Sequence, residues 1–300
     1  MLWSKAIGAG GTLGGAGGTL FGPRGVFGGG YSGAINNTID YIPIATTGNA
    51  TDFGDLTLAR YTPSATSDGS RGVFGGGYSG AQSTIIDYIT ISTLGNAIDF
   101  GDLTVGRSAS GGTSNGSRGV FGGGGGTNTI DYITIATTGN AIDFGDLTVS
   151  RSELGATSDG SRGVFGGGGS STNTIDYITI ATTGNAIDFG DLTVGRGSFA
   201  ATSDGSRGVF GGGFSPITNT IDYITIATTG NAIDFGDLTA ARNGVAATSD
   251  GSRGVFGGGR DASSAYLNTI DYIPIATTGN ATDFGDLTLA RGFFSATSGG

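Results

Sequence analysis

Two carboxylates three residues apart recur in every copy of the segment DFGDL, as at Asp188 and Asp191. Carboxylate oxygens are the ligands that calcium prefers in proteins. On a strand, however, residues i and i+3 point to opposite faces, so a shared ion requires that Gly190 bend the chain. We therefore expect these carboxylates to pair with arginines and to cap turns, with calcium as the open alternative and no other cofactor.

A second acid and base recur at nearly constant places, the Asp of IDY, as at Asp176, and the Arg of SRG, as at Arg162. Because burying one charge alone is costly, groups repeated in this way are expected to pair. The pattern predicts buried or half-buried ion pairs between neighbouring structural units.

Other catalytic groups are scarce. The chain has no His and no Cys, which removes the commonest general base and all thiolate ligands. The segment GVFGGG has neither a Lys nor a following helix, so it does not predict a phosphate-binding loop. SDGS resembles the Asp box of sialidases, but a sialidase also needs an arginine cluster and a Glu–Tyr pair, and Glu153 is the only Glu. We predict that the protein is not an enzyme.

Composition and charge limit the classes of partner that the protein can bind. The 300 residues include 64 Gly, and 24 acidic against 14 basic residues give a formal net charge of -10. A surplus of negative charge repels nucleic acids and anionic membranes, so no nucleic-acid partner is expected. The apolar part of MLWSKAIGAGGTLGG is short and interrupted by glycines, which predicts no membrane insertion. Residues 1–23 are expected to form an N-terminal arm that either attaches to a partner or closes the fold.

Six copies of one repeat make up the rest of the chain, residues 24–300. The copies are 44 to 47 residues apart, and each begins with an Arg in RGVFGGG, namely Arg24, Arg71, Arg118, Arg162, Arg207 and Arg253. Each copy reads as four short strands, GATSD, RGVFGG, TIDYITI and AIDFGDLTV. Asp-Gly pairs such as Asp68-Gly69 predict tight hairpin turns, and Asn115-Gly116 in the third copy indicates that backbone geometry is what this position requires.

A four-stranded antiparallel unit of about 46 residues repeated six times predicts an all-β fold, a six-bladed β-propeller. The repeat resembles the kelch repeat: a basic residue opens the unit, an apolar strand ends in glycines, a Tyr follows in the third strand, and an aromatic residue marks the fourth. Phe53 and its five equivalents replace the kelch Trp. Tyr41, Phe53 and their equivalents are expected to fill the spaces between blades. Either residues 17–26 or residues 291–298 could supply the closing strand.

The copies differ mainly in two windows, one after the triple glycine and one after the Arg that follows DFGDLT. In a four-stranded meander both windows emerge at the same end, so one face of the ring varies while the other is uniform. Loops held by a rigid scaffold are where binding residues concentrate. The predicted contact residues are the aromatic and charged members of these windows: Tyr31, Tyr61, Tyr78, Glu153, Phe199, Phe214, Arg260, Asp261, Tyr266, Phe293 and Phe294. Neutral drift of unconstrained loops is the alternative.

The segments NTIDYITIATTGNA and DFGDLT are similar to those of Gly-rich, kelch-like repeat proteins of tailed phages, especially phages of aquatic bacteria. That resemblance implies a virion structural or adhesion protein in a tail fibre, baseplate or capsid decoration. Its partners would be other virion proteins and a host-surface glycan or protein, and its oligomeric state would be set by the particle. One alternative is a cellular, cell-surface or extracellular propeller that binds a protein or glycan, and another is a glycan-acting enzyme.

Overall fold

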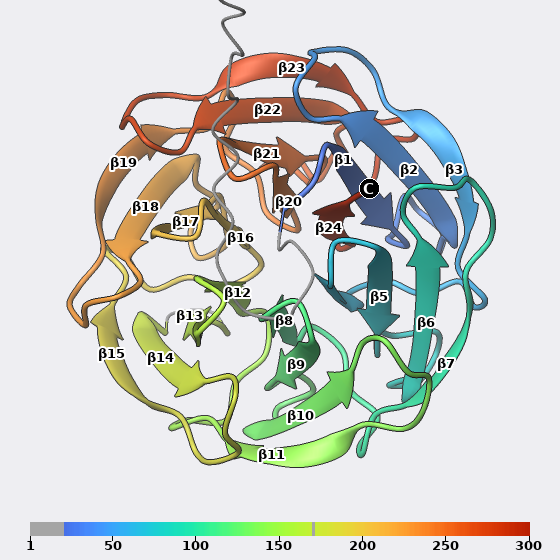
Figure 1. The fold of residues 1–300 in the computed structure, drawn as a ribbon. Coiled ribbons are helices and arrows are strands. Elements are labelled where there is room, and N and C mark those ends of the chain that lie inside the picture. Colours follow the sequence, from blue (N-terminus) through green and yellow to red (C-terminus); the bar gives the residue numbers. More distant parts are fainter. Residues whose placement is uncertain (1–20, 170–171) are drawn as a thin grey trace, which may run out of the picture.

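Six four-stranded antiparallel sheets surround a central axis in a computed structural model, which describes residues 21–169 and 172–300 (Figure 1). The predicted six-bladed β-propeller is confirmed. Within the described ranges there is no helix that is long and apolar enough to cross a membrane. The expected N-terminal arm falls mostly on residues 1–20, which lie outside the described part of the chain.

Each blade runs from an innermost strand beside the axis to an outermost strand on the wall of the ring. The first three blades, in this order, consist of β24 (Ser295–Gly299), β1 (Arg24–Gly28), β2 (Thr38–Pro43) and β3 (Thr51–Asp55); β4 (Ser64–Ser67), β5 (Arg71–Gly75), β6 (Ile85–Thr90) and β7 (Ile98–Asp102); and β8 (Gly111–Ser114), β9 (Arg118–Gly122), β10 (Thr129–Thr134) and β11 (Ile142–Asp146). The last three consist of β12 (Gly155–Ser158), β13 (Arg162–Gly166), β14 (Thr174–Thr179) and β15 (Ile187–Asp191); β16 (Ala200–Ser203), β17 (Arg207–Gly211), β18 (Thr220–Thr225) and β19 (Ile233–Asp237); and β20 (Ala246–Ser249), β21 (Arg253–Gly257), β22 (Thr269–Pro274) and β23 (Thr282–Asp286).

The C-terminal strand closes the ring. β24 pairs antiparallel with β1, from Arg24↔Gly299 to Gly28↔Ser295, and supplies the innermost strand of the first blade. Of the two segments that could fill this position, the C-terminal one does so. The first blade therefore joins strands from both ends of the chain, which couples its stability to closure of the whole ring.

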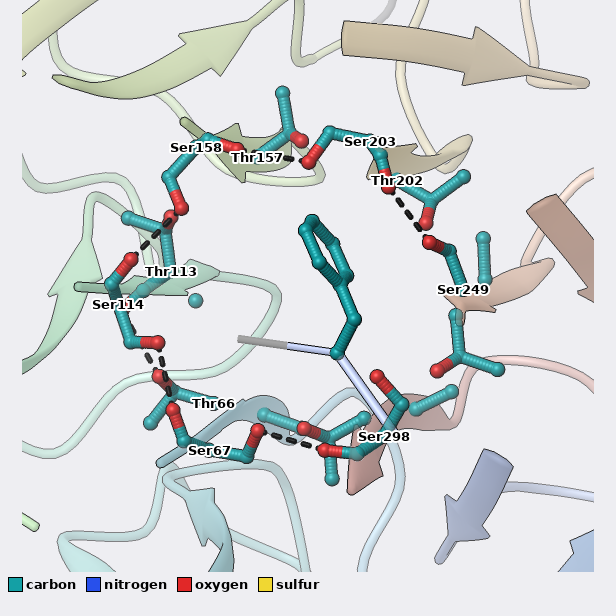
Figure 2. Close-up of a pocket in the computed structure, with 17 residues that line it drawn as sticks. Thr66, Ser67, Thr113, Ser114, Thr157, Ser158, Thr202, Ser203, Ser249 and Ser298 are labelled. Atoms are coloured by element: carbon teal, nitrogen blue, oxygen red, sulfur yellow. Dashed lines mark hydrogen bonds between the residues drawn. The ribbon is translucent and has the colours of Figure 1, made fainter. Parts of the chain in front are cut away.

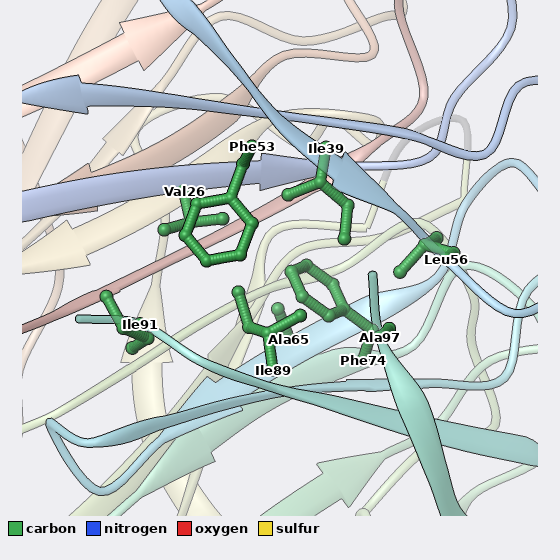
Figure 3. Packing of buried hydrophobic residues seen from close by; sticks show 9 residues of the cluster. All are labelled: Val26, Ile39, Phe53, Leu56, Ala65, Phe74, Ile89, Ile91 and Ala97. Atoms are coloured by element: carbon green, nitrogen blue, oxygen red, sulfur yellow. The ribbon is translucent and has the colours of Figure 1, made fainter. Parts of the chain in front are cut away.

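Apolar side chains fill the spaces between blades, and one of these clusters is shown in Figure 3. Val26, Ile39 and Phe53 of the first blade pack there against residues of the second, including Phe74 and Ile89. Tyr41 covers the same cluster with its ring edge-on to Phe53, 6.0 Å between ring centroids. Equivalent clusters fill the other five spaces, so the predicted inter-blade role of these Tyr and Phe residues is confirmed.

The last Gly of each RGVFG strand is explained by packing between blades. A Cβ added to Gly28 would lie 2.7 Å from the ring of Phe74, which belongs to the equivalent strand, β5, of the next blade. Gly75 faces Phe121 in the same way, and the series continues around the ring to Gly257 and Phe27. Each blade thus uses a Gly to admit the Phe of the next, because close-packed interiors leave no room for both side chains.

The outer strand of each blade is covered by a turn of the next blade. Gly95 donates its backbone N–H to the Phe53 carbonyl (3.0 Å), and Ala97 donates to that of Asp55 (2.8 Å). The side chain of Asn96 accepts the N–H of Asp55 at 3.0 Å. These bonds satisfy an edge that would otherwise be open to pairing with another chain. The near-invariant TTGNA turn and DFGDL strand therefore form one interlocking joint.

Candidate functional site

The recurring acid of IDY belongs to a buried joint between blades. Asp87 in β6 accepts hydrogen bonds from the Thr57 hydroxyl and from Arg60, whose Nη2 lies 2.9 Å from Oδ2 with both side chains fully buried. Arg60 also donates to the Phe74 carbonyl. Burial lowers the pKa of the Arg60 guanidinium, and the charge of Asp87 opposes that shift. The same joint occurs six times, which identifies it as part of the scaffold.

The partner of the acid differs from the one predicted. Asp176 pairs with Arg151, in the linker that precedes its blade, and not with Arg162. Arg162 instead lies over the ring of Tyr177, 4.8 Å from its centroid, and donates to the Ile226 carbonyl of the next blade. The expected inter-blade pairing exists, but the assignment to the SRG arginine is wrong because that side chain is taken up by a cation–π contact and a backbone carbonyl.

The DFGDL carboxylates take no part in the ion pairs found among the described residues, so the expected Asp–Arg pairing is wrong for this segment. Asp188 is exposed on the outer wall. No three acidic side chains within residues 21–169 and 172–300 gather into a group that could hold a metal ion. Capping is carried by the SDGS acids: Asp68 accepts the N–H groups of Ser70 and Arg71, and Asn115 accepts the equivalent pair in the third blade.

Two ends of the ring can now be defined. The loop face carries the connections between the second and third strands of each blade and the linkers between blades; the turn face carries the SDGS and TTGNA turns. Backbone bridges tie each loop to a linker, as where Tyr78 and Tyr61 exchange N–H···O bonds of 2.8 and 3.1 Å. The residue that follows the triple glycine is thus fixed beside the residue that follows the linker Arg.

Four of the predicted contact residues form a continuous row on the loop face, which we call the tyrosine row: Tyr266, Tyr31, Tyr61 and Tyr78. Their rings touch in sequence, with centroid separations of 5.8, 5.8 and 5.4 Å. All four are half-buried. Partial burial raises the pKa of the Tyr61 hydroxyl, and the neighbouring hydroxyls of Tyr78, Tyr31 and Tyr266 add to the shift. The row crosses loops of the sixth, first and second blades.

The loop that carries Tyr266 is shaped by Asp261. Its carboxylate accepts the N–H groups of Ser263 and Ala265 and the Ser263 hydroxyl, and these bonds, together with nearby Arg260, lower the pKa of Asp261. Arg260 donates to the Ser264 carbonyl and bridges Tyr266 through the backbone. The two charged residues therefore hold the loop in place beside the row.

Loop length divides the loop face. The first, second and sixth blades have windows of six to eight residues after the triple glycine, YSGAIN, YSGAQS and RDASSAYL, whereas the third and fourth have GGT and GSS. The tyrosine row thus lies over the blades with the longest loops. Phe214, in the fifth blade, is 43% exposed and lies apart from the row, where it bridges Gly197 through the backbone.

Two predicted contact residues lie in the core. Phe199 and Phe294 are each only 5% exposed and belong to clusters between blades. They occupy the third position after the linker Arg and line the floor of a pocket on the axis, which Glu153 and Phe293, at the second position, line as well. Phe199 and Phe294 therefore do not form part of the open loop surface, and a partner could reach them only from inside that pocket.

A second axial pocket opens on the turn face (Figure 2). The ends of the innermost strands surround it with serines and threonines, and Ser hydroxyls donate to Ser carbonyls of neighbouring blades, as from Ser114 to Ser67 at 2.6 Å and from Ser158 to Ser114 at 2.7 Å. Phe21 also lines this pocket, against the turn at Gly251. Five such bonds link the six innermost strands, from Ser67, Ser114, Ser158, Ser203 and Ser249, which suits a structural collar better than a ligand site.

Sequence reasoning missed the remaining residues of the loop-face pocket, among them Thr62, Ala109 and Ser198. They lack the charge or aromatic ring that selected the contact set, but all three have positive φ, as does Glu153. The available signal was their common place, two residues after each linker Arg. No protein-family model matches the chain, and no curated protein matches it in a sequence search.

Proposed function

We propose that this chain is a non-enzymatic adhesion or structural component of a phage particle, in a tail fibre, baseplate or capsid decoration, and that it binds its partner through the loop face. The particle assignment is supported by the resemblance of its repeats to those of Gly-rich phage proteins. The binding assignment is supported by one observation above all, the tyrosine row. Half-buried Tyr side chains offer large, rigid contact areas with a polar end, and they are enriched at the centres of interfaces.

Several uniform parts of the repeat have structural roles in the described chain, as the Arg60–Asp87 pair and the Gly95–Phe53 bond illustrate. The variable windows, by contrast, bring aromatic side chains of three blades together. Neutral drift would not be expected to assemble four tyrosines into one continuous row. Loops held on a rigid scaffold are where binding residues concentrate, which supports a recognition role for this face.

The positions of the chain ends favour a particular orientation. Phe21 lies at the axis beside the SDG turn of Gly251, and Gly300 donates its N–H to the Gly69 carbonyl. Both ends of the propeller therefore lie on the turn face. Attachment to a particle through residues 1–20 would leave the loop face directed away from the attachment point, free to meet a host surface.

Mass spectrometry and immunogold labelling of purified phage test the particle assignment, and absence of the chain from every particle preparation would overturn it.

Binding is tested by adding the isolated protein to host cells before phage and measuring adsorption. We expect wild-type protein to reduce adsorption and Y61A/Y78A to lose that effect. Leu94→Ala, which removes a 57% exposed apolar side chain from the turn face, is the matched control and should behave as wild type. Equal inhibition by Y61A/Y78A would contradict the role of the tyrosine row. A propeller that labels host or other cells but no particle would indicate the cellular or extracellular alternative.

A further inference from the structure

The loop face has a closed ring of hydrogen bonds at its centre, which we call the axial ring. The second residue after each linker Arg donates its N–H to the carbonyl of its counterpart in the preceding linker, over distances of 2.5 to 2.9 Å. The six members, in order around the axis, are Thr62, Ala109, Glu153, Ser198, Gly244 and Phe293. All have φ between 51° and 66°, a left-handed conformation that most residues avoid. The ring holds six backbones in one orientation and leaves their side chains to define the mouth of the pocket.

The six side chains of the axial ring differ in kind, although their backbones are equivalent. Glu153 is the only charged member, and Phe293 is the only aromatic one. Three steps separate them in either direction around the ring, so they lie on opposite sides of the axis. The carboxylate of Glu153 lies against Gly197, where an added Cβ would meet Oε2 at 3.0 Å. Both residues line the same pocket.

The pocket floor is mostly apolar, with Ser110 as its hydroxyl-bearing residue, and two more hydroxyl groups lie at the mouth. The floor consists of the third residues after the linker arginines, including Leu154, Val245 and Phe294, each 5% exposed. Thr62 and Ser198 add hydroxyl groups at the mouth. The volume of the pocket, open mouth included, is about 400 Å³. No Arg or Lys lines this pocket among the described residues.

We propose that the loop-face axial pocket binds an alkylammonium group, as carried by a lysine side chain of a partner protein or by a free primary amine. The carboxylate of Glu153 would accept hydrogen bonds from the ammonium group, and the face of Phe293 would attract the same cation across the pocket. The apolar floor would take up the methylene stem, as apolar surfaces do for lysine stems elsewhere. A net charge of -10 adds a favourable long-range field for a cation.

Other ligand classes fit less well. An anion would meet the carboxylate of Glu153 with no described basic residue in the lining to offset it. A divalent metal ion requires several oxygen ligands, and Glu153 is the only carboxylate in the lining. A neutral apolar chain could occupy the floor but would leave the carboxylate to be desolvated without a partner, which is costly.

Methyl NMR of the isolated protein tests the proposal, because Leu154 and Val245 place reporters on the pocket floor. The probes are n-butylammonium, acetyl-Gly-Lys-Gly-amide, and the same peptide with norleucine in place of lysine. We expect both cationic probes to shift these two methyl signals saturably, with no such response to the norleucine peptide. A response to n-butylammonium alone would assign the pocket to free amines, whereas tighter binding of the lysine peptide would assign it to a protein partner.

Glu153→Gln keeps the shape of the side chain and removes its charge, so it should weaken binding of both cationic probes by about tenfold or more. Asp188→Asn, which removes the same charge from the exposed outer wall, is the matched control and should bind as wild type. Equal responses to lysine and norleucine peptides, or unchanged binding by Glu153→Gln, would overturn the proposal. The inference deepens the proposed loop-face binding and rests on it. Its failure would leave particle detection and the Y61A/Y78A adsorption result unaffected, and failure of the particle assignment would leave this titration unaffected.

Discussion

Asp40 and Arg291 pair across the seam of the ring, 251 residues apart in sequence, with Oδ2 and Nη2 separated by 3.1 Å and both side chains fully buried. The pair belongs to the same joint that links every other pair of neighbouring blades. At the seam it also fixes the linker that leads into β24, the strand that completes the first blade. Loss of this pair should therefore lower the stability of the whole ring.

Removal of the acid should be strongly destabilising. Asp40→Ala leaves the Arg291 guanidinium buried without its carboxylate, a change that typically costs about 3–5 kcal/mol. Asp176→Ala, within the ring, should cost a similar amount, whereas Asp188→Ala on the exposed wall should change the free energy of unfolding by about 0.5 kcal/mol or less. Urea unfolding followed by circular dichroism measures all three. A loss for Asp40→Ala no larger than that for Asp188→Ala would contradict the role of the buried pair.

Truncation should reveal the closing strand. Removal of residues 295–300 deletes β24 and exposes the edge of β1 that it covers. We expect this variant to lose the cooperative thermal transition of the full chain or to associate through the open edge, as size-exclusion chromatography would show. Deletion of Gly300 alone removes one backbone hydrogen bond to Gly69 and is the control. A truncated protein that melts like the full chain would show that closure by β24 is dispensable.

Alanine substitutions at two glycines distinguish the cost of backbone strain from the cost of disturbing the packing between blades. Gly190 has φ +146°, and an added Cβ would lie 2.5 Å from the Gly230 carbonyl oxygen of the next blade. Gly184 has a similar φ, +156°, with nothing within 4 Å of the added atom. Ala at either position incurs strain of about 1–3 kcal/mol, but only Gly190→Ala also displaces the neighbouring turn. Gly190→Ala should have the lower melting temperature, and equal melting temperatures would argue against the joint.

The tyrosine row should be visible in an alkaline titration followed by absorbance at 295 nm. The pKa of Tyr61 in the folded protein is raised from its ordinary value of 10.0, mainly by burial. The stabilisation linked to this shift is therefore present below the unfolded pKa and is lost as the pH rises through the folded pKa. Tyr61→Phe should remove a late-titrating component relative to wild type. An unchanged titration curve would contradict this assignment, and protein unfolded in urea gives the unshifted reference.

Calcium should have little effect on stability. The carboxylates of Asp188 and Asp191 do not join a third acidic residue in the described part of the chain, and Gly190 lies against the Gly230 turn of the next blade. Melting curves in calcium and in a chelator are expected to coincide, with Asp188→Asn as a comparison. A rise in melting temperature with calcium that Asp188→Asn abolishes would establish a site that this geometry does not predict.

Much of the architecture could be predicted from the repeat. The period and the four strand segments predicted a six-bladed propeller, and Asp-Gly with its Asn-Gly variant predicted the capped turns at Asp68 and Asn115. These features are local or periodic, so a single sequence reveals them. The comparison of copies also predicted a varied face, since topology alone places both windows at one end.

The sequence alone could not predict which arginine contacts which acidic or aromatic side chain. Arg151 and Arg162 are equally regular, and only the packed structure assigns Arg151 to Asp176 and Arg162 to Tyr177. The sequence also left two candidates for the strand that closes the ring, and the structure shows that the C-terminal segment, β24, pairs with the edge of β1.

The sequence by itself determined the repeat, the strand count and the candidate loops, because these depend on residue type and spacing. Tertiary structure decided which aromatic residues are buried, as with Phe294, and which are brought together, as with Tyr31 and Tyr61. It also decided that Glu153 and Phe293 line opposite sides of one axial pocket. The physical reason is that ring closure makes neighbours of residues that are far apart in the chain, and one sequence carries no direct record of such distances.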